Sequence, residues 1–204
     1  MKKLLTLIAL VSCITFGTQA QNTVRVGSGG GGLAYEKGDK IIQVGLGLGR
    51  AIGGGGYGWA YGGGAGLSLN AALELGIHEY FSVGPYVAAG RYNLGTIAGL
   101  GRSDYRLTAI AAGVRGSFHY VPLLNEVAGT NIDEEKLDLY VAVLLGLEFY
   151  STNFDNDLIR YNSTVFDGGA VLGGRYKFNP RMSVFTELGY AGLSVWTLGI
   201  SFHL

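Results

Sequence analysis

The sequence predicts an all-β fold, an eight-stranded antiparallel up-and-down β-barrel that spans a membrane. Apolar side chains recur at every second position in eight separate segments, and two is the period of a β-strand. Only 15% of the residues are charged, well below the roughly 25% of soluble domains. The 36 glycines and 13 tyrosines suit a narrow barrel interior and the aromatic belts at the two membrane surfaces.

Residues 1–20 have the features of an export signal. Two lysines precede the apolar stretch Leu4–Phe16, and small residues favour cleavage after Ala20. A second interpretation stays open, because the sequence LVSC that ends at Cys13 resembles a bacterial lipobox and would make Cys13 a lipidated first residue. Both interpretations export the chain from a bacterial cytoplasm.

The barrel is expected over residues 40–204, after a flexible glycine-rich leader at residues 21–39 that has little fixed structure. The first strand, Lys40–Arg50, alternates apolar residues with glycine. Glycine weakens strand interiors, so this choice indicates an inner face without room for side chains.

A long glycine-rich loop follows the first strand and carries the aromatic residues Tyr57, Trp59 and Tyr61. Aromatic residues are enriched at contact hot spots and in interfacial belts of membrane proteins. The three residues are therefore candidates for contact with a ligand or partner, and equally for an interfacial belt.

The second strand, Gly66–His78, and the third, Phe81–Arg91, repeat the alternation and are joined by a short link. A longer link leads to the fourth strand, Tyr105–Val121. The connection that follows, Pro122–Glu135, is longer than expected for its side of the barrel and has room for a short helix.

The fifth strand, Lys136–Ser151, is the most apolar, and the sixth, Thr164–Phe178, follows a polar loop. Tight turns lead to the seventh strand, Met182–Tyr190, and the eighth, Leu193–Leu204. Each strand is near the roughly 9–11 residues that cross a bilayer at barrel tilt. Links one, three and five are long and links two and six short, which indicates outer loops at one end and periplasmic turns at the other.

Six ionisable side chains fall on the face that the alternation turns inward, three of each sign. An arginine that faces lipid at the midplane costs about 2–4 kcal/mol, and a charge in the lumen still needs an opposite partner because it loses hydration. An eight-stranded barrel is just wide enough for side chains to fill. We therefore expect a salt-bridge plug rather than a gated polar path. Four of the side chains should form it in the lower to middle lumen, namely Glu74, Arg115, Arg175 and Glu187, whereas Glu148 should lie nearer the outer mouth. The six residues are Glu74, Arg115, Glu148, Arg175, Lys177 and Glu187.

The sequence predicts no catalytic, cofactor or metal site. Its glycine runs do not fit G-x-G-x-x-G before a helix, and no G-K-[ST] follows them. The histidines, His78, His119 and His203, lie near periplasmic strand ends without cysteine or carboxylate at ligand spacing. A serine–histidine enzyme that modifies lipid would need its site at the opposite end. Balanced charge, 15 basic and 15 acidic groups, gives no attraction to nucleic acid.

The last strand reads W-x-L-x-I-x-F-x-L, and the expected signal junction reads TQAQ. With these features, residues 40–204 resemble small bacterial outer-membrane β-barrels of the OmpA, OmpX and OmpW type, and more narrowly those common in Bacteroidetes. In such families the barrel-assembly machinery recognises the last strand, usually through a terminal phenylalanine. The resemblance thus implies an assembly signal, outer-membrane lipid and that machinery as partners, and a monomer. The signal residues are Trp196, Leu198, Ile200, Phe202 and Leu204.

The expected function is that of a non-enzymatic outer-membrane barrel with a structural or loop-mediated role and a charge-plugged lumen. One alternative is an OmpW-like channel for small apolar molecules, which needs an apolar lumen with a lateral opening; the inward charges argue against it. The other alternative is a barrel component of an envelope or secretion assembly, suggested by the long Pro122–Glu135 link.

Overall fold

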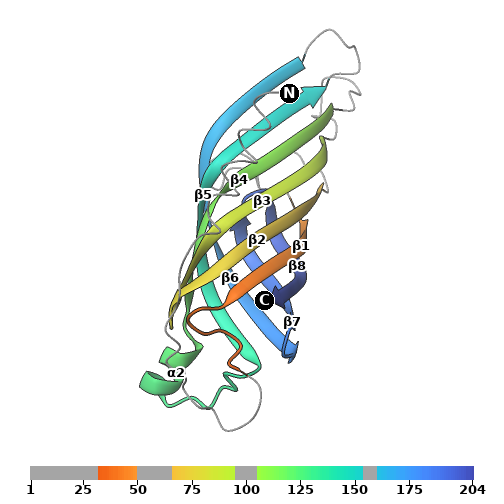
Figure 1. The fold of residues 1–204 in the computed structure, drawn as a ribbon. Helices are drawn as coiled ribbons and strands as arrows, with labels where there is room; N and C mark the ends of the chain where they lie inside the picture. The colour runs from red at the N-terminus through yellow and green to blue at the C-terminus, as the bar shows by residue number, and fades with distance from the viewer. Residues whose placement is uncertain (1–31, 50–65, 95–104, 154–159) are drawn as a thin grey trace.

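The computed structural model describes residues 32–49, 66–94, 105–153 and 160–204. Over these residues the chain forms a closed barrel of eight strands paired in sequence order, each antiparallel to its neighbours (Figure 1). The predicted fold class is confirmed. The strands are β1 Lys40–Leu48, β2 Gly66–His78, β3 Phe81–Leu94, β4 Tyr105–His119, β5 Leu137–Asn153, β6 Arg160–Asn179, β7 Met182–Ala191 and β8 Ser194–His203.

Apolar side chains cover the outside of the barrel. Along β1 buried and exposed residues alternate strictly, and the inner positions are occupied by Ile41, Gln43 and two glycines. A continuous apolar outer surface of this kind is suited to lipid rather than to water. On that surface the Trp196 indole donates a hydrogen bond to Thr186 Oγ1 at 2.8 Å, so both polar groups are satisfied without water.

Among the described residues, no helix is long and apolar enough to cross a membrane.

The fourth strand ends two residues earlier than predicted, and a helix follows it. Val121, expected at the end of the strand, instead begins α2 Val121–Ala128. Pro122 explains the change, since proline lacks the N–H that a ladder needs but fits the first turn of a helix. Gly129, with φ of 63°, ends the helix and donates its N–H to the Leu124 carbonyl.

The hairpin of β5 and β6 is longer than predicted. Residues expected to form a polar loop continue both strands, and Arg160 pairs with Asn153. The two strands have 17 and 20 residues, so the expected length of 9–11 residues is wrong for them. The pairing of β6 with β7 ends at Val171 and Gly189. Residues 160–170 of β6 extend beyond that point and pair with β5.

The structure also corrects the predicted extent of the flexible leader. Residues 32–39 lie against the lower end of the barrel, where Ala34 and Tyr35 are buried. The signal segment 1–20, the rest of the leader and Arg50 lie outside the described residues. The loop aromatics Tyr57, Trp59 and Tyr61 do so too.

Inward glycines make room for large rings on the neighbouring strand, at the position paired with the glycine. A Cβ at Gly173 would lie 2.1 Å from a ring carbon of Tyr140, which is fully buried. A Cβ at Gly66 would lie 1.9 Å from the ring of Tyr92, also fully buried. The lumen is thus packed by pairing a glycine on one strand with a tyrosine on another.

We therefore expect Gly173→Ala to destabilise the barrel by about 1–3 kcal/mol, the usual cost of overpacking a filled interior. Gly116→Ala is the matched control, because a Cβ there meets only the Ser82 carbonyl oxygen, at 4.0 Å. Urea unfolding in detergent micelles measures both changes. Equal unfolding midpoints for the two variants would contradict the close packing of Gly173.

Candidate functional site

An ionic network crosses the lower half of the lumen, and Glu74 on β2 is its centre. One carboxylate oxygen of Glu74 lies 3.0 Å from Nε of Arg115 on β4, and the other lies 2.6 Å from Nη2 of Arg175 on β6. Arg115 Nη2 also lies 2.7 Å from Oε1 of Glu187 on β7. All four side chains are buried. The network therefore links four strands across the lumen.

Two residues outside the six predicted ones extend the network downward. Arg175 Nη1 lies 3.1 Å from Asp138 Oδ2, and Asp138 Oδ1 lies 2.9 Å from His119 Nδ1. The other ring nitrogen of His119 lies 3.0 Å from Ser82 Oγ. The network thus ends on Ser82 near the lower end of β3.

The ring of Tyr140 lies among these charges and holds them in place. The guanidinium carbons of Arg115 and Arg175 lie 5.3 and 5.2 Å from its centroid, within the range of a cation–π contact. Its hydroxyl donates to Glu187 Oε1 at 2.8 Å and accepts from Gln43 Nε2 at 3.4 Å. One tyrosine therefore contacts both arginines and one of the carboxylates.

Each guanidinium of the network contacts two carboxylates. Arg115 lies between Glu74 and Glu187, and Arg175 lies between Glu74 and Asp138, which also contacts the His119 ring. Buried charges are tolerated only when they are paired and hydrogen-bonded. Each carboxylate and each guanidinium of the network therefore has an opposite charge beside it in the lumen.

The other two predicted lumen charges lie elsewhere. Glu148 is near the outer end, where it accepts hydrogen bonds from the hydroxyls of Tyr150 and Tyr190. The Tyr190 hydroxyl also bonds Asp167. Lys177 lies at the lower end, and its Nζ donates to the carbonyls of Gly32 and Leu33 at 2.8 and 2.9 Å.

Residues 32–39 close the lower end of the lumen. The ring of Tyr35 stacks on His119, with centroids 3.5 Å apart and planes 5° from parallel. Its hydroxyl donates to the carbonyls of His78 and Phe81 at 2.8 and 2.5 Å. Tyr35 thus covers the end of the ionic network, and Lys177 holds the chain just before it through the carbonyls of Gly32 and Leu33.

The Ser82–His119–Asp138 chain has the hydrogen-bond order of a serine hydrolase triad. The sequence did not lead us to expect it, because the three residues lie on three different strands. Ser82 is only 3% exposed, and Tyr35 lies flat on the imidazole. Asp138 also holds Arg175. This geometry satisfies buried polar groups and leaves no room for a substrate beside the hydroxyl.

The three histidines do not meet. His119 bonds Ser82 and Asp138, His203 Nε2 lies 2.9 Å from Ser183 Oγ, and His78 Nδ1 accepts from the Tyr80 N–H at 3.3 Å. Within the described part of the chain, no group of three or more histidine, cysteine, aspartate or glutamate side chains is placed to hold a metal ion.

Sequence reasoning missed Asp138, Asp167 and Tyr35 as members of these sites. The alternation could have found the two aspartates, because each occupies an inward position of its strand. Tyr35 follows a run of glycines and has no periodic neighbours, so no signal beyond the isolated aromatic residue pointed to it.

A search of protein-family models and of curated proteins finds no match for this chain. Among solved structures, it is similar to Ail, the attachment invasion locus protein of Yersinia pestis, with a TM-score of 0.48 and 13% identity over 82% of this chain and 99% of that one. It is also similar to Neisserial surface protein A, with a TM-score of 0.43 and 11% identity over 81% and 94% of the two chains. A designed transmembrane β-barrel aligns with a TM-score of 0.41 and 13% identity, over 83% and 98%. The assignment of the fold rests on the strand pairing of this chain itself.

Glu74→Gln tests the ionic network. The substitution removes the charge that both arginines share, and breaking a buried ion pair in this way costs about 3–5 kcal/mol because it leaves charge uncompensated. We expect a clear fall in the unfolding midpoint, measured by heat-modified gel migration and urea titration. Glu135→Gln, at an exposed position of the connection to β5, is the control. Equal midpoints for the two variants would argue against the network.

Residues 32–39 should be held more tightly at acid pH. Burial raises the pKa of the Asp39 carboxyl to about 6, so the folded protein keeps a proton that the unfolded chain releases near pH 4. The stabilising contribution is therefore complete below about pH 4 and is lost as the pH rises through about 6. Thermal unfolding midpoints, measured from pH 4.5 to 7 in steps of about half a pH unit, should show this loss.

Asp39→Asn should remove that part of the pH dependence. Asp133→Asn is the matched control, because a hydrogen bond from Lys136 lowers the pKa of Asp133, which is then ionised throughout this range. If Asp39→Asn lost as much stability as the wild type between pH 5 and 7, the effect would have another source.

Proposed function

We propose that this protein is a non-enzymatic outer-membrane β-barrel of a bacterium, with a plugged lumen and a structural role or a role carried by its outer loops. The ionic network carries the proposal. Glu187, Arg115, Glu74, Arg175, Asp138 and His119 join five strands in one chain of contacts across the lower lumen. A pore for ions would need these contacts to open at the cost of unpaired buried charge.

A second seal, of a different kind, lies above the network. An apolar cluster fills this part of the lumen, and it includes Tyr86, Leu144 and Leu193. Leu193 belongs to the short turn between β7 and β8 and is fully buried. Tyr92 holds this turn by donating its hydroxyl to the Leu193 carbonyl at 2.6 Å. The upper seal therefore supports the proposal of a closed lumen independently of the charges.

We propose that the barrel is a monomer in outer-membrane lipid, inserted through its last strand by the barrel-assembly machinery. The outward side chains of that strand, at positions 196, 198, 200, 202 and 204, are all large, apolar and exposed. β8 also closes the ring by pairing with β1 from Ile41 and His203 to Leu48 and Trp196.

One observation favours a second candidate, entry of small apolar molecules from the side. Residues 160–170 of β6 extend beyond its last pair with β7, and the lumen near that level holds members of the apolar cluster beside the carboxylates of Glu148 and Asp167. Leu193 fills the space that such a molecule would occupy. The plugged barrel is therefore the function that the geometry supports best.

Conductance in planar bilayers decides between a plug and a path. We expect the purified full chain to give no steady single-channel steps, whereas Arg115→Ala, which removes the central cation, should give frequent openings. Reproducible steps of one size from the wild type would contradict the plug.

Labelling of Ser82 by a fluorophosphonate probe would contradict the non-enzymatic assignment, and Ser82→Ala supplies the control for that reaction.

A further inference from the structure

The helix α2 leaves an apolar face uncovered at the periplasmic end of the barrel. Val121 is buried, and Leu124 and Asn125 are partly buried against the rest of the chain. Leu123 and Val127 are 39% and 77% exposed. Residues four positions apart lie on the same face of a helix, so these two side chains form one apolar ridge directed away from the protein.

The direction of this ridge is fixed. The Asn125 side chain donates to the Ile132 carbonyl at 2.9 Å and to Glu134 Oε1 at 2.7 Å, and it accepts from the Ile132 N–H at 3.0 Å. On another side of the helix, the Tyr80 hydroxyl donates to Glu126 Oε2 at 3.4 Å. Bonds to both the following connection and the β2–β3 turn prevent α2 from rotating to bury its apolar ridge.

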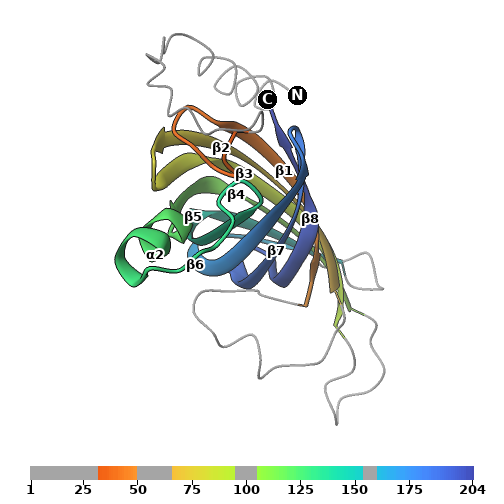
Figure 2. The same cartoon turned by 90° about the horizontal axis from the view of Figure 1, so that it is seen from below.

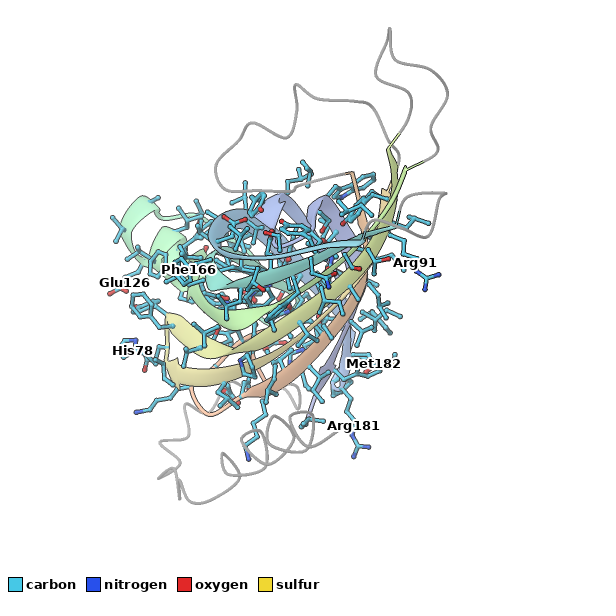
Figure 3. All side chains as sticks on the ribbon, turned by 90° about the horizontal axis from the view of Figure 1, so that it is seen from above. His78, Arg91, Glu126, Phe166, Arg181 and Met182 are labelled. Atoms are coloured by element: carbon cyan, nitrogen blue, oxygen red, sulfur yellow. The ribbon has the colours of Figure 1, made fainter. Side chains whose placement is uncertain are left out.

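The ridge lies beside the outer wall of the barrel and next to its lower aromatic rim. Seen from below, α2 lies outside the ring of strands (Figure 2). From above, Glu126 of α2 and His78 at the end of β2 lie on the same outer side, whereas Arg181 lies on another (Figure 3). The ring of Tyr80 lies 6.5 Å from that of Phe118, which lies 5.1 Å from that of Phe81, an exposed residue of the outer apolar surface. The helix therefore continues the surface that faces lipid.

We propose that α2 rests on the periplasmic leaflet of the membrane, with Leu123 and Val127 seated between the lipid headgroups and the acyl chains. Short amphipathic helices bind at this depth, and aromatic rims mark it in β-barrels. The connection between β4 and β5 thus anchors the barrel at a fixed depth in the bilayer. This inference rests on the membrane-spanning barrel and does not depend on whether its lumen is plugged.

The charges near α2 indicate how it binds lipid. The helix has no basic residue, and its connection to β5 carries Asp133, Glu134 and Glu135, with Lys136 paired to Asp133 at 3.1 Å. Attraction to anionic headgroups is therefore excluded as the driving force. Burial of the apolar ridge should make the binding insensitive to salt and to the charge of the lipid.

A fluorescent label on the ridge tests the proposal. In full-length protein with Cys13→Ser, a bimane label is placed at Val127→Cys, and at Asn131→Cys, in the exposed connection, as the control. The protein is reconstituted into phosphatidylcholine vesicles whose acyl chains are brominated near the headgroup. We expect the brominated lipid to lower the emission of the Val127→Cys label roughly twofold, as for a group at the headgroup boundary. Aqueous iodide should quench only the Asn131→Cys label.

Further arms of the experiment can overturn the proposal. Adding Leu123→Asp should reduce lipid quenching of the Val127→Cys label, whereas salt or anionic lipid should leave it unchanged. Quenching of both labels by iodide would place α2 in water. Protection of the Val127→Cys label from both quenchers would mean that protein, either a partner or a second copy, covers the ridge. Either result would overturn the proposal and leave the conductance test of the plug unaffected.

Discussion

The constraint behind this structure is that lipid offers no partner for a backbone N–H or C=O group, so the sheet must close on itself. Pairing of β8 with β1 meets this constraint by joining the end of the barrel to its beginning. The Leu204 N–H adds a bond to the Lys40 carbonyl at 2.9 Å. Once the ring has closed with eight strands, its diameter is set, and the interior is only as wide as the side chains that fill it.

The narrow lumen explains the unusual composition of the inner face. Bulky rings such as Tyr140 fit only where a glycine such as Gly173 lies beside them on the neighbouring strand, and this explains the inward glycines at such positions. Polar groups inside must bond one another because little water enters. The lower lumen meets this demand with the ionic network around Glu74. Above it, apolar residues around Leu193 fill much of the space, and Glu148 and Asp167 near the outer end are bonded by tyrosine hydroxyls. These layers of different chemistry follow from one geometric limit.

The same reasoning shows what the sequence could and could not predict. A period of two assigns each strand residue to one face, and the fold class and the facing of Glu74 and Arg175 follow from it. The contact between these two residues does not, because β2 and β6 are not neighbours and the contact depends on register and tilt around the whole ring. Local chemistry also overrode periodicity. Pro122 turned the end of β4 into a helix, and residues at the polar start of β6 remained in the sheet because β5 pairs with them.

The Ser82–His119–Asp138 chain shows why hydrogen-bond order alone does not define an active site. A hydrolase triad needs an accessible nucleophile and donors for the developing oxyanion, whereas here Tyr35 covers the imidazole and Asp138 is shared with Arg175. Three adjacent strands each contribute one inward polar residue near the same end. A buried carboxylate, imidazole and hydroxyl that must satisfy one another have few other arrangements available. The resemblance to a triad therefore arises from the demand to pair buried polar groups, and the same demand makes these residues part of the ionic network.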